Sequence, residues 1–324
     1  MRTAPRSLRA LADAGLRGVG QVLFQDSPVS GLLFLAGLAV VSPLYALAAL
    51  LGSLIGSVFA GVLRADRSLL QTGMFGFNGA LTALALLFFL KPTVLTWLCV
   101  VLAATCSSVL LLGCMTWLER WKLPALTAPF VLITFCVFLA SAGFGRLETT
   151  SLMPTASLPK AATVQGIVTV DSLLHGTLNG LAQIFFQSHW LSALLFAAAL
   201  LVRSPAACLI ALAGSLTGAL VAWGMGAAEP SIRAGLFGFN SALVAVALAC
   251  VFHPCNRRTL AWALLAAAIT PFVHAALSAT LALLGLPALT LPFVLVTWVF
   301  LLAGTRLPAL SDMKPNQKQG MPHP

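Results

Sequence analysis

Charged residues are scarce in this chain of 324 residues. Asp, Glu, Lys and Arg together make up 8% of the sequence, 60% of the residues are apolar, and the mean hydropathy is +1.00. An ordinary soluble domain carries about 25% charged residues. The composition therefore excludes a soluble domain and predicts an all-α membrane protein that crosses the bilayer several times.

Motifs of catalysis and cofactor binding are also missing. The sequence holds no phosphate loop, dinucleotide fingerprint or catalytic triad, and its seven cysteines include no Cys-x-x-Cys pair. The His and Cys of residues 253–256 are interpreted as part of a loop. We therefore expect no enzyme activity, no cofactor and no metal site.

The chain contains an internal duplication. Residues 123–132, LPALTAPFVL, and residues 286–295, LPALTLPFVL, differ at one position. Residues 75–81, FGFNGAL, recur as FGFNSAL at 237–243, and residues 21–25, QVLFQ, recur as QIFFQ at 183–187. Three matches at nearly one spacing predict two homologous halves. We place them at residues 1–150 and 163–310, with a linker at 151–162 and a disordered tail at 311–324.

Each half shows five apolar stretches, most of them near the length of about 20 residues that spans a bilayer. In the first half these are residues 30–41, 44–63, 74–90, 94–118 and 125–144, and in the second 192–202, 206–225, 236–252, 260–284 and 288–303. Residues 1–17 are expected to form a surface helix. Because five is odd, the second half is predicted to lie inverted in the membrane.

The distribution of basic residues supports that topology. With the amino terminus inside, 14 of the 18 Lys and Arg residues fall on the inner side. We therefore predict that both termini are cytoplasmic. The net charge of +10 is then a topology signal and gives no reason to expect a nucleic-acid partner.

Charges are absent from the centres of all ten predicted spans. Proton relays and ion-coupling sites normally need buried ionisable groups. A passive pathway for a neutral solute is therefore favoured. Sodium sites built only from carbonyls and hydroxyls stay as an alternative.

The repeated decapeptides indicate where such a pathway runs. Pro129 and Pro292 are expected to lie inside a helix, where each would free the carbonyl of Ala125 or Ala288. A freed carbonyl at bilayer depth needs a protein partner or a polar cavity. The hydroxyls two positions before each proline, those of Thr127 and Thr290, are expected near the same place. The simpler alternative is that each hydroxyl bonds its own helix.

The repeated Phe-Gly-Phe-Asn elements suggest close packing and flat apolar surfaces. Gly76 and Gly238 would let backbones approach, and Asn78 and Asn240 would cap a helix that starts at depth. Four phenylalanines recur by the same spacing and are interpreted as two ring pairs that form slots for a planar solute: Phe24 with Phe77, and Phe186 with Phe239.

These doubled motifs, LPxxTxPF and FGFN, resemble those of the urea transporter family over about residues 20–302. The resemblance implies a urea pore between the halves of each protomer, a short pore helix per repeat ending near Gln25 or Gln187, and a homotrimer in the cell membrane in contact with lipid. By position it assigns one urea site to Gln21, Phe24, Phe77 and Leu81. It assigns the second site to Gln183, Ile184, Phe186, Phe239 and Leu243, with Thr127 and Thr290 at the constriction between them. A channel or sodium-coupled transporter for another small neutral solute, such as a short amide or ammonia, stays open.

Overall fold

The computed structural model describes residues 8–159 and 163–307 of the chain, which divides into two compact units. Unit 1 comprises Met1–Ser157 and Leu281–Pro287, and unit 2 comprises Leu158–Thr280 and Ala288–Pro324. Within the described ranges the structure is helical and contains no β-strand; one isolated bridge pairs Leu90 with Thr149. The expected all-helical fold is thus confirmed for these residues. The predicted tail, residues 311–324, lies outside them.

Apart from the short elements η1 and η2, the same succession of α-helices occurs twice along the described residues. The first consists of α1 (Leu8–Gln21), α2 (Pro28–Val41), α3 (Pro43–Val62), α4 (Arg67–Gln71), α5 (Phe77–Phe89), α6 (Val94–Leu118), η1 (Glu119–Trp121) and α7 (Ala128–Ser141). The second consists of α8 (Val170–Gln183), α9 (Trp190–Arg203), α10 (Pro205–Gly224), α11 (Glu229–Arg233), α12 (Phe239–Val246), η2 (Ala247–Val251), α13 (Arg257–Ala282) and α14 (Leu291–Gly304). The spacing of the sequence repeats therefore sets where the helices begin.

Among the described residues, four helices are long and apolar enough to cross a membrane by length and composition. They are Pro43–Val62, Val94–Trp121, Pro205–Gly224 and Arg257–Ala282. The other apolar helices are shorter; α2, for example, has 14 residues, or about 21 Å at 1.5 Å per residue, against a hydrocarbon core of about 30 Å. The structure supports four crossings by length, and the arrangement of ten crossings stays a prediction.

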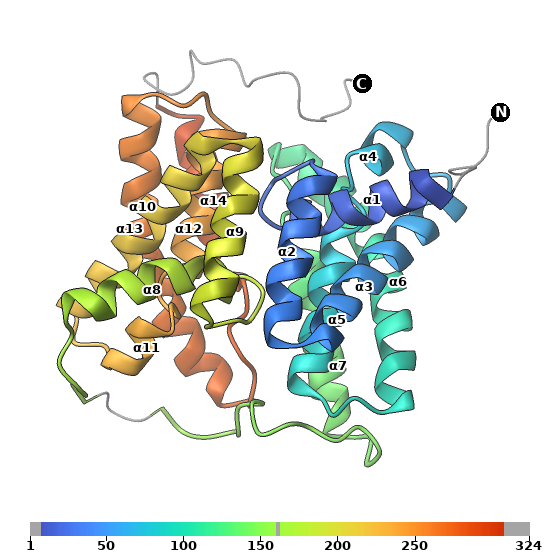
Figure 1. Cartoon of the computed structure of the whole chain (residues 1–324), viewed down its shortest axis with the longest axis horizontal. Helices are drawn as coiled ribbons and strands as arrows, with labels where there is room; N and C mark the ends of the chain where they lie inside the picture. Colours follow the sequence, from blue (N-terminus) through green and yellow to red (C-terminus); the bar gives the residue numbers. More distant parts are fainter. Residues whose placement is uncertain (1–7, 160–162, 308–324) are drawn as a thin grey trace. The chain divides into compact units, whose positions relative to one another are not determined.

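A short helix opens each unit. Figure 1 shows α1 and α8 lying at a steep angle to the helices that follow them in their own unit. The surface helix expected over residues 1–17 and the following pore helix are, over the described residues, one continuous helix that ends at Gln21. No break between the two expected elements occurs in the described residues 8–21, and residues 1–7 of the expected surface helix lie outside them. No helix breaker lies between them, since Gly15, Gly18 and Gly20 are tolerated inside a helix.

The centre of each unit is a close contact between two helices. α5 packs against α3 in unit 1, and α12 packs against α10 in unit 2. A Cβ added to Gly52 on α3 would lie 2.2 Å from the carbonyl oxygen of Gly79 on α5, and one added to Gly218 on α10 would lie 2.3 Å from that of Phe237. Small residues thus let the backbones touch, as is common between membrane helices.

Candidate functional site

The predicted site residues of each unit come from three segments that the fold brings together. In unit 1, α5 packs against both α1 and α7, and in unit 2, α12 packs against both α8 and α14. The segments are the end of the short helix, the start of α5 or α12, and the start of α7 or α14. We call each set a half-site. The first half-site contains Gln21, Phe24, Phe77, Leu81 and Thr127; the second contains Gln183, Ile184, Phe186, Phe239, Leu243 and Thr290.

A strained turn follows the short helix of each unit. Phe24 and Phe186 have φ of 60° and 59°, a left-handed conformation that is unusual for a bulky residue. The turn is closed by main-chain bonds, since the Phe24 N–H donates to the Gln21 carbonyl at 3.0 Å and the Phe186 N–H donates to that of Gln183 at 3.0 Å. The same conformation is therefore built twice from different neighbouring residues.

The glutamines just beyond these turns face inward. Gln25 and Gln187 are buried, and their side-chain amides donate to the carbonyls of Leu23 at 2.8 Å and Phe185 at 3.0 Å. Each amide thus bonds a carbonyl of its own turn. These bonds of the amide nitrogens stabilise the turns, whereas the Oε1 atom of Gln25 is buried and has no hydrogen-bond partner among the described residues.

The starts of α5 and α12 supply the second segment. Phe77 and Phe239 are the first residues of these helices, and the next residue, Asn78 or Asn240, contacts the third segment. The Asn78 amide donates to the Leu126 carbonyl at 3.4 Å and accepts from the Phe130 N–H at 3.1 Å. Asn240 does the same in unit 2, with Leu289 at 3.2 Å and Phe293 at 3.3 Å.

These two asparagines are caps supplied by a neighbouring helix. Phe130 is the third residue of α7 and Phe293 the third of α14, so their N–H groups have no partner within their own helix. The carbonyl that Asn78 holds belongs to Leu126, which has φ of 50°, and Leu289 has the same φ. The expectation that the asparagines cap a helix is confirmed, and the capped helices are α7 and α14.

The prolines of the repeated decapeptide do not break a helix. α7 begins at Ala128 and α14 at Leu291, so Pro129 and Pro292 occupy the first helical turn. Backbone N–H groups in the first turn have no acceptor within the helix, so proline loses no hydrogen bond there. The expectation that they lie inside a helix was wrong because the chain before each proline forms an irregular turn.

The carbonyls expected to be freed by these prolines are bonded. The Ala125 carbonyl accepts from the Ala128 N–H and the Ala288 carbonyl from the Leu291 N–H, both at 3.2 Å. That expectation was also wrong. Thr127 and Thr290 are the N-cap residues of α7 and α14 and are 4% and 3% exposed, and their side chains do not cap their own helices.

Most of the predicted site residues are buried in the chain. Those with part of their surface exposed are Gln21, Phe24, Gln183 and Phe186, all from the first segment. The buried ones are Phe77, Leu81, Thr127, Ile184, Phe239, Leu243 and Thr290. None of these eleven side chains is charged.

The two half-sites differ at their glutamines. The Gln21 amide donates to the Thr72 carbonyl at 2.8 Å, so this N–H is already bonded. No hydrogen bond reaches the Gln183 carboxamide from the described part of the chain. The carboxamide of Gln183 therefore has more free donors and acceptors than that of Gln21.

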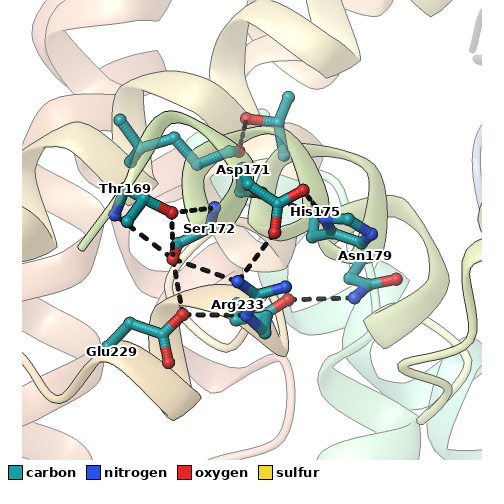
Figure 2. Close-up of polar contacts among 9 residues, drawn as sticks. Thr169, Asp171, Ser172, His175, Asn179, Glu229 and Arg233 are labelled. Carbon is teal, nitrogen blue, oxygen red and sulfur yellow. Dashed lines mark hydrogen bonds and ion pairs between the residues drawn. The ribbon is translucent and has the colours of Figure 1, made fainter. Parts of the chain in front are cut away.

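A charged network stabilises the opposite end of α8 (Figure 2). Arg233 on α11 lies 2.8 Å from both Asp171 and Glu229, and the Ser172 hydroxyl donates to Glu229 at 2.5 Å. The hydrogen bond from Arg233 lowers the pKa of Asp171, and those from Ser172 and Arg233 lower the pKa of Glu229. Asp171 precedes Gln183 by nearly the whole length of α8, so the network lies outside the half-site and fixes α8 against α11.

Some features of the half-sites had no signal in the sequence. The left-handed backbone at Leu126 and Leu289 was not expected, and only the repetition of the decapeptide marked these positions. The sequence also gave no reason to pair His274 with the second half-site, where its ring lies 5.7 Å from that of Phe239 between centroids.

Comparison with known proteins assigns a family to this architecture. The family model described as "Urea transporter" matches residues 12–305. The chain is 32% identical over 261 residues to urea transporter 1 of Rattus norvegicus, a match that covers 77% of this chain and 65% of that protein. It is 31% identical over 276 residues to urea transporter 1 of Ovis aries, covering 82% of this chain and 69% of that protein. The chain thus spans about two thirds of the length of these relatives. It is a member of the urea transporter family.

Proposed function

We propose that this protein is a membrane channel through which urea passes passively down its concentration gradient. The observation that carries the proposal is the extent of the family match, which begins within α1 and ends at the residue that follows α14. Both half-sites lie inside it. The relatives in this match are named for urea transport.

The chemistry of the half-sites supports urea as the solute. Urea is planar and neutral, and it carries four amide hydrogens and one carbonyl oxygen. The oxygens of the Gln21 and Gln183 carboxamides can accept from urea N–H groups, and the free amide of Gln183 can donate to the urea oxygen. Aromatic rings at Phe24 and Phe77 in one half-site, and at Phe186 and Phe239 in the other, offer flat apolar faces for the plane of the molecule.

Rejection of ions follows from the same composition. No predicted site residue carries a charge, so sodium or chloride would lose its hydration shell without a compensating partner. Moving an ion out of water without such a partner costs far more than moving a neutral amide. Urea would therefore be selected over ions without a gate.

The proposal includes a topology and an assembly. The two repeats would lie inverted in a cell membrane, with ten crossings, both termini cytoplasmic, and a pore between the repeats of each protomer. Thr127 and Thr290 would lie at the constriction between the two urea sites. Three protomers would form a homotrimer surrounded by lipid. The excess of basic residues on the predicted inner side supports the orientation.

An alternative is a sodium-coupled transporter for a small neutral solute. The two mechanisms differ in their dependence on a gradient. The purified protein is reconstituted into liposomes that contain buffer, and the liposomes are mixed rapidly with urea. Urea entry is followed by light scattering, with and without a sodium or proton gradient. Urea entry faster than in empty liposomes and unchanged by either gradient supports the channel; entry that requires a gradient contradicts it. The absence of urea entry under all conditions contradicts urea as the solute.

A further inference from the structure

His274 is the one histidine whose side chain contacts a half-site in the described part of the chain. It lies on α13, and its ring is 5.6 Å from that of Phe237 and 5.7 Å from that of Phe239 between centroids, nearly perpendicular to both. Its Nδ1 atom lies 3.5 Å from the side-chain nitrogen of Asn240. It therefore contacts both the predicted ring and the capping asparagine of the second half-site.

The hydrogen bonds of Asn240 define the role of each atom in this contact. Its oxygen accepts from the Phe293 N–H and its nitrogen donates to the Leu289 carbonyl. The atom facing His274 is therefore the amide nitrogen, which only donates. His274 Nδ1 must then accept, so a neutral imidazole carries its proton on Nε2.

The first half-site has no equivalent of this contact. The position that corresponds to His274 by the spacing of the decapeptides is Leu111, a buried apolar residue on α6. Asn78 makes the bonds to Leu126 and Phe130, and leucine cannot accept a further one. The second amide hydrogen of Asn78 thus lacks the acceptor that Asn240 has.

An imidazole within a long apolar helix is costly to place. α13 is one of the four helices long and apolar enough to cross a membrane, and a polar ionisable group within such a segment usually serves a function. The cost is offset here by one hydrogen bond and two ring contacts, all of them with the Phe237–Asn240 element.

We propose that His274 is a positioning residue of the second half-site: it orients Asn240 and the ring of Phe239, and it makes this site bind urea more tightly than the first. The inference rests on the proposed urea channel. Asn240 holds the start of α14 next to Thr290, so loss of the imidazole loosens both the ring and the turn before α14. The two half-sites therefore differ in affinity despite their repeated sequence.

The test compares three variants by urea flux in proteoliposomes. His274→Leu installs the residue of the first half-site, His274→Asn keeps an acceptor near the position of Nδ1, and His189→Leu removes an exposed histidine of the same unit. We expect His274→Leu to raise the half-saturating urea concentration about two- to tenfold, the range expected from one lost hydrogen bond, with a smaller change in maximal flux. His274→Asn should restore most of the affinity, and His189→Leu should behave as wild type.

The inference would be overturned if His274→Leu had the same half-saturating urea concentration as wild type. It would also be overturned if His274→Leu and His274→Asn lost urea affinity to the same extent. Size-exclusion profiles and unfolding temperatures of all variants separate a folding defect from an altered site.

A second measurement does not depend on urea: nitrogen NMR of histidine-labelled protein should show His274 protonated on Nε2, with the signal assigned by its loss in His274→Asn. A proton on Nδ1 would also overturn the inference. Failure of the wild type to pass urea would instead contradict the channel.

Discussion

Phe24 and Phe186 share a left-handed backbone, with φ of 60° and 59°, at the same place in the two units, three residues after α1 and α8 end. A bulky residue held in this conformation costs roughly 1–3 kcal/mol. Such strain persists only where the surroundings enforce it, and it concentrates at ligand sites. Its repetition therefore supports a shared role for the two turns.

Replacement of Phe24 separates backbone strain from the aromatic ring. In Phe24→Gly both the strain and the ring are lost, so we expect an unfolding temperature equal to or above that of wild type and lower urea flux. Phe24→Leu keeps apolar bulk but loses the flat face, and its flux should fall about two- to tenfold, as expected for a lost ring contact. Phe144→Leu, at an exposed phenylalanine, serves as the control. Wild-type flux in both Phe24 variants would contradict a role of this ring.

The Asn78 cap should contribute strongly to stability. Asn78→Ala leaves the Phe130 N–H and the Leu126 carbonyl without their side-chain partner, and each buried unpaired group costs about 1–3 kcal/mol. We expect a clear drop in unfolding temperature. Thr82→Val on the same helix is the matched control, because the Thr82 hydroxyl is buried and has no hydrogen-bond partner among the described residues. Equal unfolding temperatures in the two variants would argue against the cap.

Close packing at Gly76 predicts a steric effect. A Cβ added there would lie 2.4 Å from the Ser53 hydroxyl, which itself bonds the Gly15 carbonyl at 2.7 Å. Gly76→Ala should therefore destabilise the protein by about 1–3 kcal/mol. Gly113→Ala, at a glycine of α6 with nothing within 4 Å of the added Cβ, should be neutral or stabilising. Thermal unfolding in detergent compares the two, and a tolerated Gly76→Ala would show that the close contact can relax.

The network around Arg233 predicts acid sensitivity. Hydrogen bonds lower the pKa of Asp171 and Glu229 in the folded protein, so their contribution to stability is present at neutral pH. It is lost as protons bind, below the unfolded pKa values of about 4. Arg233→Gln should therefore lower the unfolding temperature at neutral pH, and its difference from wild type should shrink below about pH 4. A difference that is the same at both pH values would contradict this account.

The sequence predicted that the series of helices occurs twice, because equivalent helices in the two halves begin at repeated positions of the sequence. α3 and α10, and α5 and α12, begin at equivalent positions, and α1 and α8 end at equivalent positions. The Phe-Gly-Phe-Asn and Leu-Pro-x-x-Thr motifs also located two of the three segments of each half-site, and their packing against each other follows from Asn78 and Asn240.

Other features depend on tertiary contacts that no single motif shows. Pro129 was expected to disrupt a helix, yet the Leu126 turn places it at a helix start, where proline is favoured. The different bonding of Gln21 and Gln183 depends on the Thr72 carbonyl, far away in sequence. The stretches expected at residues 74–90 and 125–144 each begin three residues before the helix that forms there, α5 or α7, because the chain makes a turn at these positions.

Two pairs of threonines give a matched comparison at the proposed constriction. Thr127 and Thr290 precede the first turns of α7 and α14. Thr134 and Thr297 lie further along the same helices, fully buried, and their hydroxyls lack a partner among the described residues. Replacement of any of them by valine keeps the volume and removes only a hydroxyl.

The most direct test of the urea channel is stopped-flow urea permeability of proteoliposomes without an ion gradient. It compares wild type, Thr127→Val/Thr290→Val and Thr134→Val/Thr297→Val with empty liposomes. We expect fast, saturable urea entry in wild type and in the Thr134/Thr297 variant, and entry reduced severalfold in the Thr127/Thr290 variant, in keeping with about 1 kcal/mol per lost hydrogen bond. Wild-type permeability equal to that of empty liposomes would contradict it.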